Sequence, residues 1–149
     1  KANDEQNVKT FVAGQWTLEY DLAHGGMACE VLTAARLASK DEAIHAGREQ
    51  YDQVIEHAVA EYDGYTNAGM SAEQISSSIY ALFHRKVASK AIAAQYLVDI
   101  LEQRYEGSPR AHQTVRDILP SYLVEAITYV TSRLALSAEL PSQPQAQMP

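Results

Sequence analysis

Apolar side chains recur at every third or fourth position along almost the whole chain. This spacing places them on one face of an α-helix, whereas a half-buried β-strand alternates apolar and polar residues. Runs of β-branched residues between tight turns, the usual sign of strands, are nearly absent. The sequence therefore predicts an all-α fold: a single helical bundle of five or six helices with a long central helix and a disordered C-terminal tail.

Length and composition fit one globular domain. The chain has 149 residues, of which 46% are hydrophobic and 21% charged. A chain of this size buries enough surface to fold without a metal or a disulfide. The single cysteine, Cys29, has no partner within the chain, so cysteine usage leaves the redox compartment open. We predict a helical domain over residues 1–140, a flexible tail over 141–149, and no membrane span.

Capping patterns suggest where helices begin and end. Gly25–Gly26 is expected to end a first helix. Ser39 with Glu42, three residues later, has the form of a capping box that opens a third helix after a short second one. Ser71 with Gln74 repeats this pattern and predicts the start of a fourth helix.

The fourth helix is expected to be the spine of the bundle. Its apolar spacing continues from Ile75 to Tyr105, about nine turns of α-helix, and ends before Gly107. Pro109 suits the first turn of a following helix, and Pro120 is expected to break the chain before a last one. Because the apolar stripe of the fourth helix is wide, it could also serve as the interface of a homodimer.

The charge balance restricts the class of partner. Twelve basic and nineteen acidic side chains give a formal net charge of −7. This sign disfavours a surface that collects phosphates, so we predict no nucleic-acid partner. Residues 40–70 hold two basic and seven acidic side chains and carry most of the excess. Such a segment is usually a solvated helix face, and the alternative is a docking surface for a basic partner.

Tyrosine usage favours the docking alternative. The chain has nine tyrosines but only two phenylalanines and one tryptophan. Tyrosine combines a large apolar ring with a hydroxyl that tolerates water, which suits a protein interface. An aromatic ridge edged with carboxylates on the third helix could dock into a basic cleft, unless its rings merely cover the bundle. The candidate partner-binding residues are Tyr51, Asp52, Glu56, Tyr62, Asp63 and Tyr65.

Metal ligation is a weaker interpretation. Asp21 with His24, and Glu42 with His45, each place a carboxylate and an imidazole on one helix face. Di-iron bundles require two Glu-x-x-His helices and two further glutamates, and this pattern matches poorly. We therefore predict no metal and no cofactor. Whether the five histidines converge on a ligand depends on the fold; they are His24, His45, His57, His84 and His112.

Catalytic motifs are also absent from the sequence. No nucleophile elbow, His-Glu-x-x-His pair, phosphate-binding glycine loop or Cys-x-x-Cys pair occurs. His84 lies beside Arg85 and Lys86, a weak signal for phosphoryl transfer. Cys29 falls in an apolar helix, where burial is expected to raise its pKa. We predict no catalytic residue and no enzymatic activity.

These observations favour a non-enzymatic protein-binding module, such as a small acidic bacterial inhibitor or immunity protein that docks a basic partner. One alternative is a helical sensor of a small molecule or metal, with Phe11, Trp16, Met27 and Phe83 as apolar residues able to line its cavity. A second alternative is a self-associating structural module. The polar start at Lys1, without Met, is typical of an exported protein after leader removal, so we expect a periplasmic or otherwise exported location, with the cytoplasm as the alternative.

Overall fold

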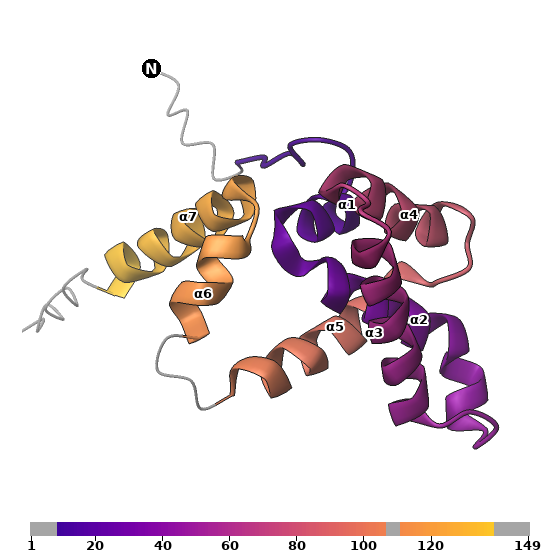
Figure 1. Cartoon of the computed structure of the whole chain (residues 1–149). Helices are drawn as coiled ribbons and strands as arrows, with labels where there is room; N and C mark the ends of the chain where they lie inside the picture. The colour runs from indigo at the N-terminus through magenta and orange to yellow at the C-terminus, as the bar shows by residue number, and fades with distance from the viewer. Residues whose placement is uncertain (1–8, 107–110, 139–149) are drawn as a thin grey trace, which may run out of the picture. The chain divides into compact units, whose positions relative to one another are not determined.

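Every regular element in the described part of the chain is helical. The computed structural model describes residues 9–106 and 111–138 (Figure 1), and no strand occurs in those ranges. The predicted all-α fold is confirmed. In chain order the elements are α1 (Leu18–Leu22), the π-helical turn η1 (Ala23–Met27), α2 (Ala28–His45), α3 (Tyr51–Asn67), α4 (Ala72–His84), α5 (Lys90–Tyr105), α6 (Ala111–Ile118) and α7 (Ser121–Ala138).

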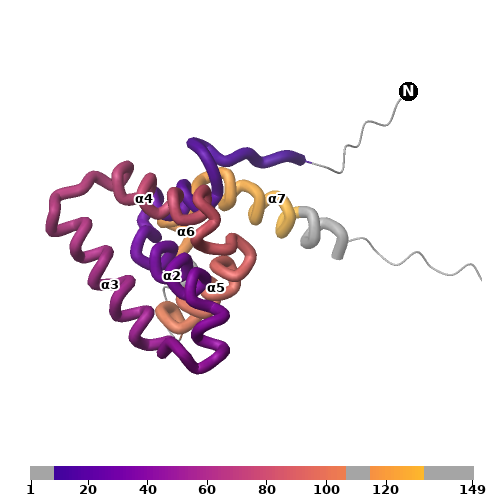
Figure 2. Tube along the Cα trace, turned by 90° about the vertical axis from the view of Figure 1, so that its right-hand side faces the viewer, coloured from indigo at the N-terminus to yellow at the C-terminus, as the bar shows by residue number. Residues whose placement is uncertain are grey.

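The longest helical segment lies at the centre of the packing. α1, η1 and α2 follow one another without a gap and form one segment of 28 residues. Counted as one helix, it makes six helices in the described ranges. α2 contacts α3, α4 and α5, and Figure 2 shows it between α3 and α5. The predicted bundle of five or six helices with a long central helix is confirmed, but the long helix is not the one that the sequence indicated.

The helix predicted over residues 75–105 is two helices. α4 ends at His84, and Lys86 adopts a left-handed backbone with φ of 57°. The backbone hydrogen bonds after His84 follow the Schellman pattern that closes a helix. α5 then begins after Ser89, whose hydroxyl accepts a hydrogen bond from the Ile92 N–H at 3.4 Å. Apolar spacing missed this break, because it indicates which residues are buried and not whether the helix between them is continuous. The fourth helix is therefore not continuous, and a homodimer interface on this segment stays a prediction.

The glycine pair interrupts the helical path where the first helix was expected to end. Gly25 and Gly26 lie in η1, and the non-helical backbone of Gly26 makes a kink there between α1 and α2. Gly26 has φ of +121°, a conformation that side chains with a Cβ rarely adopt. A Cβ on Gly25 would lie 2.9 Å from the carbonyl oxygen of Ile118, next to the end of α6. Glycine is needed here both for the backbone conformation of this kink and for the close approach of Ile118.

One of the two expected capping boxes is correct. Ser71 and Gln74 form it at the start of α4: the Ser71 N–H donates to Gln74 Oε1 at 2.8 Å, and the Gln74 N–H donates to Ser71 Oγ at 3.3 Å. Ser39 instead lies within α2, where its hydroxyl donates to the Arg36 carbonyl at 2.7 Å. The expected short second helix and the third helix opening at Ser39 are therefore wrong: α2 continues to His45.

The core is built around α2. Leu32, Ala35 and Leu37 are almost completely buried, and neighbouring α2 residues are buried on other sides of the helix. A helix that is apolar around most of its circumference must be surrounded by other elements. Met27 from η1, and Ile79 from α4, complete this core and are fully buried. Small alanines on α2 permit its neighbours to approach closely.

Polar side chains on and beside α2 are paired with neighbouring helices. Glu30, at 5% exposure, forms an ion pair with Arg104 of α5. Glu19 of α1 and Lys90 of α5 form another, with Nζ and Oε2 3.0 Å apart. A buried carboxylate without a cation would be strongly destabilising, so the Glu30 pair fixes α5 against α2.

The chain divides into two compact units, residues 13–120, and residues 1–12 together with 121–149. The first contains α1 to α6. In the described part of the second, the Phe11 ring packs on Tyr129 with centroids 5.9 Å apart, and Lys9 lies over both rings. The predicted tail over 141–149 lies outside the described residues, and the predicted 1–140 domain stays a prediction. No helix among the described residues is both long enough and apolar enough to cross a membrane.

Two glycine substitutions test the backbone assignment. We expect Gly25→Ala to lower the free energy of unfolding, because its new methyl group meets the Ile118 carbonyl. Gly64→Ala is the matched control: Gly64 lies in α3 with nothing within 4 Å of its Cβ position. That substitution is expected to stabilise the protein by about 0.5–1 kcal/mol. Chemical denaturation followed by circular dichroism measures both, and equal stability of the two variants would contradict the close approach.

Candidate functional site

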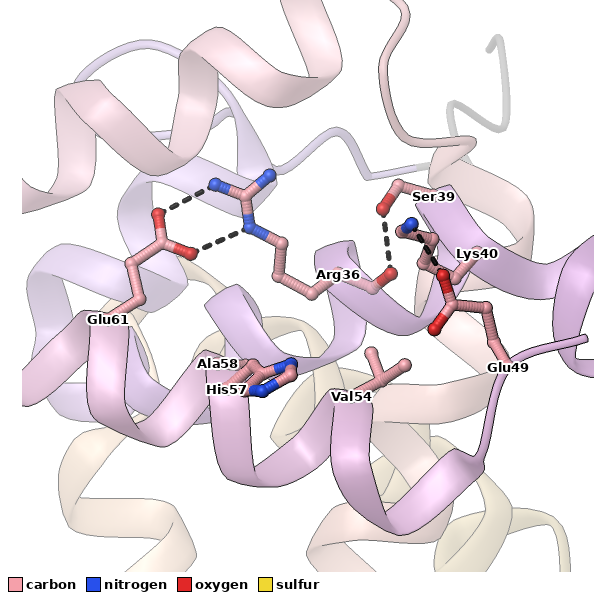
Figure 3. Close-up of a pocket in the computed structure, with 8 residues that line it drawn as sticks. All are labelled: Arg36, Ser39, Lys40, Glu49, Val54, His57, Ala58 and Glu61. Carbon is pink, nitrogen blue, oxygen red and sulfur yellow. Dashed lines mark hydrogen bonds and ion pairs between the residues drawn. The ribbon is translucent and has the colours of Figure 1, made fainter.

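α3 carries all six candidate partner-binding residues, and its inner face is fastened to α2. Val54 and Ala58 are the buried residues of this helix. Glu61 accepts two hydrogen bonds from the Arg36 guanidinium, from Nε to Oε2 at 2.8 Å and from Nη2 to Oε1 at 2.6 Å (Figure 3). The Tyr65 hydroxyl also donates to Glu61. A two-point bond between a guanidinium and a carboxylate fixes both distance and orientation, so it sets how α3 lies along α2.

This pairing changes the acidity of its members. The Arg36 guanidinium holds the pKa of Glu61 below its usual value. Burial, together with the carboxylate of Glu61, raises the pKa of Tyr65 to about 12. Tyr65 is therefore engaged inside the molecule as a hydrogen-bond donor.

The other tyrosines of the predicted ridge are also partly covered. The Tyr51 ring lies 6.1 Å from that of Tyr96 on α5. Tyr96 donates a hydrogen bond to Asp41 Oδ1 at 2.7 Å, and burial followed by this carboxylate raises its pKa to about 12. Tyr62 is half-buried. The structure thus places the three tyrosines at partly buried positions.

The three remaining candidates lie together on an exposed flank of α3. Asp52, Glu56 and Asp63 are all exposed, and their spacing of four and seven residues places them along one side of the helix. Val59, 39% exposed, lies between them. We call these four residues the acidic flank. None of the three carboxylates has a hydrogen bond or an ion pair with another residue in the described ranges.

No cation within the helix offsets this charge. α3 contains no lysine or arginine, and neither does the wider stretch from residue 49 to residue 84. Of the four carboxylates on α3, only Glu61 is paired with a cation. The acidic flank therefore presents negative charge whose counter-charge is not supplied by α3.

A cleft of about 380 Å³ separates the start of α3 from α2 (Figure 3). Two ion pairs border it: Arg36 with Glu61, and Lys40 Nζ with Glu49 Oε1 at 2.8 Å. The His57 ring lies on the cleft side of α3 (Figure 3). The charges that border the cleft already pair with each other, and these pairs tie α3 to α2 just before its start and in its second half.

The carboxylate and histidine pairs considered for a metal are used in other contacts. The buried Asp21 accepts a hydrogen bond from the Gly14 N–H at 2.7 Å, and His24 stacks on Tyr20 with centroids 5.9 Å apart. His45 Nδ1 lies 2.9 Å from the Asp41 carbonyl oxygen. Within residues 9–106 and 111–138, no three His, Cys, Asp or Glu side chains converge as ligands.

The two residues considered for covalent chemistry have ordinary surroundings. Cys29 is half-buried, and burial raises its pKa, partly opposed by Arg104, as the sequence predicted. His84 is exposed at the end of α4, with its ring 5.7 Å from that of Tyr80. Among the described residues, neither side chain has a hydrogen bond or an ion pair with an acid or a base.

Trp16 is a residue whose position sequence reasoning missed. It was grouped with apolar residues able to line a cavity, and of these Met27 and Phe83 are buried in the core. Trp16 itself is 64% exposed. Its indole packs on Tyr20 and Tyr80, with centroids 5.3 Å and 5.4 Å away. The available signal was its place just before Thr17, the residue that caps α1.

Comparison of the chain with models of protein families, with curated proteins and with solved structures found no match in any of the three. The functional argument therefore rests on the surfaces of the chain itself.

Spectrophotometric titration of the tyrosines tests the contacts of α3. Two phenols, Tyr65 and Tyr96, are expected to ionise at about pH 12. Because their pKa in the folded protein exceeds the value of 10.0 for a free side chain, the stability they contribute is complete below pH 10 and falls as the pH rises towards 12.

Tyr65→Phe should remove one of the two phenols that ionise at about pH 12. It should also remove part of the fall in stability between pH 10 and pH 12. Tyr62→Phe is the control, because Tyr62 has no side-chain hydrogen bond among the described residues. If Tyr65→Phe left the late part of the titration unchanged, the Glu61 contact would be contradicted.

Proposed function

We propose that this chain is a non-enzymatic protein-binding module that docks a basic partner through the acidic flank of α3. The observation that carries this proposal is the set of three exposed, unpaired carboxylates, Asp52, Glu56 and Asp63, on a helix without lysine or arginine. A basic surface would supply the counter-charge that the helix lacks. Charge of this kind accelerates encounter and selects against acidic partners.

The way in which α3 is held supports the proposal. Arg36 binds Glu61 in the second half of the helix, and Lys40 binds Glu49 just before its start. A helix fixed at two separate points presents its side chains at constant spacing, so less conformational entropy is lost when a partner binds. The two functions of acidic residues are thus separated: Glu49 and Glu61 position the helix, and the acidic flank remains for the partner.

Val59 gives the acidic flank an apolar centre. Interfaces gain most of their free energy from groups that lose water on binding, whereas exposed charges at the rim mainly affect the association rate. Tyr62, half-buried on the same helix, adds aromatic area at the edge. This combination suits an inhibitor or an immunity-type protein that covers a basic cleft, an analogy of class that rests on surface chemistry.

Reversal of the charge on the acidic flank tests the proposal. We expect the triple variant Asp52→Lys, Glu56→Lys and Asp63→Lys to lose capture of the partner from extracts of the source cells. The helical circular dichroism should not change, because all three side chains are exposed and make no described pair. Affinity purification with quantitative mass spectrometry measures the capture.

A second triple variant controls for net charge. Glu73→Lys, Glu102→Lys and Glu125→Lys produces the same change in net charge at exposed positions on α4, α5 and α7. This control should retain the partner that the wild-type chain captures. Equal capture by both triple variants would reject the acidic flank as the docking surface.

A further inference from the structure

Five rings form a continuous row across α1, η1 and α4. Trp16 lies at its middle and contacts Tyr20 on one side and Tyr80 on the other. His24 stacks on Tyr20 with planes 11° apart, and His84 packs on Tyr80. Tyr20 is buried, so it supports the indole from below, while Trp16 is 64% exposed. A large ring held by two others and still open to water is the form of a binding anchor rather than of a core residue.

The surroundings of Trp16 favour a positive charge. Residues 10–35 and 49–84, which contain the whole row of rings, include no lysine or arginine. Lys90, which reaches α1 from α5, is paired with Glu19. The negative face of an indole attracts a cation directly, and no lysine or arginine within these two stretches competes for it.

Asp21 provides a second, independent indication. It is 6% exposed, and its Oδ2 accepts hydrogen bonds from the backbone N–H groups of Gly14 and Gln15, the residues just before Trp16. Its other oxygen, Oδ1, is buried and has no hydrogen-bond partner. Among the described residues, no lysine or arginine forms an ion pair with this carboxylate. A negative group buried beside the segment that carries Trp16 therefore lacks a counter-charge, and its field favours a cation bound on the indole.

The row of rings does not attract a cation equally along its length. His84 is followed directly by Arg85 and Lys86, which oppose a cation at that end. Asp21 lies on α1, the helix that begins just after Trp16. These charges favour a cation over Trp16 rather than over His84.

We propose that the exposed face of Trp16 receives an arginine side chain of a basic protein partner. A guanidinium is planar, weakly hydrated and permanently charged, so it stacks on an aromatic face better than an ammonium group. This inference rests on the proposed function only in taking the partner to be a basic protein. It adds a second contact surface, distinct from the acidic flank and formed by different helices.

Fluorescence gives a direct test, because Trp16 is the single tryptophan of the chain. The full chain is titrated with a capped tri-arginine peptide and with the same peptide in which citrulline replaces each arginine. Citrulline has nearly the shape of arginine without the charge. We expect a saturable change in the emission of Trp16 with the arginine peptide that weakens as salt is added, and no saturable change with the citrulline peptide. Equal responses to the two peptides, or no response to either, would overturn the proposal.

Calorimetry with variants separates the indole from general charge attraction. Trp16→Leu should weaken binding of the arginine peptide about two- to five-fold, the range expected for an exposed cation–π contact. The control variant Val98→Leu, at an exposed position on α5, should leave the affinity for the arginine peptide unchanged. If Trp16→Leu bound the peptide as well as the wild-type chain does, the indole would not be the site.

The same variants distinguish this proposal from the proposed function. The triple variant of the acidic flank should still show a saturable Trp16 response to the arginine peptide that exceeds its response to the citrulline peptide. Loss of partner capture by that variant, combined with no arginine response in the wild-type chain, would retain the acidic flank and reject the Trp16 site. An arginine response in the wild-type chain, combined with full partner capture by the triple variant, would retain the Trp16 site and reject the acidic flank.

Discussion

The burial of α2 is the constraint on which the rest of the structure depends. Because this helix is covered on several sides, its polar side chains cannot all remain in water and need partners on neighbouring helices. Glu30 pairs with Arg104 on α5, and Arg36 pairs with Glu61 on α3. Apolar packing alone would allow the neighbours to slide along α2, whereas these pairs favour one arrangement.

The same constraint determines which charges remain for other uses. Glu61 turns towards α2, so its charge is neutralised, while the acidic flank on the outer side of α3 has no such partner. Asp21 shows the same division within one side chain: Oδ2 holds the backbone before Trp16, and Oδ1 is left without a partner. In both places a structural contact accounts for one acidic group or atom and leaves another without a cation among the described residues.

The sequence predicted the fold class well, because helical spacing reports directly on burial. It also predicted the capping box at Ser71, since that motif is local and needs no tertiary partner. Boundaries set by backbone conformation were harder. Lys86 adopts a left-handed backbone usually given to glycine, so apolar spacing did not reveal the end of α4, whereas Gly25–Gly26 was expected to interrupt the helix and Gly26 does so.

The candidate site was predictable only in part. Composition pointed to α3, and its acidic residues do lie together on an exposed flank. The candidate set included Asp63 and not Glu61, but the physical difference between them is the guanidinium of Arg36, which is distant in the chain and binds Glu61. Trp16 was missed for the same reason: Tyr80, which supports its ring, lies on another helix.

The central claim is that the acidic flank is the surface on which a basic partner docks. The most direct measurement places a photo-crosslinking amino acid at Val59, in the middle of the flank, and another at Val98 on α5 as the reference position. After irradiation in the source cells, the account predicts a defined adduct with a basic protein from position 59 and none from position 98. The absence of an adduct at position 59, or the same adduct from both positions, would contradict it.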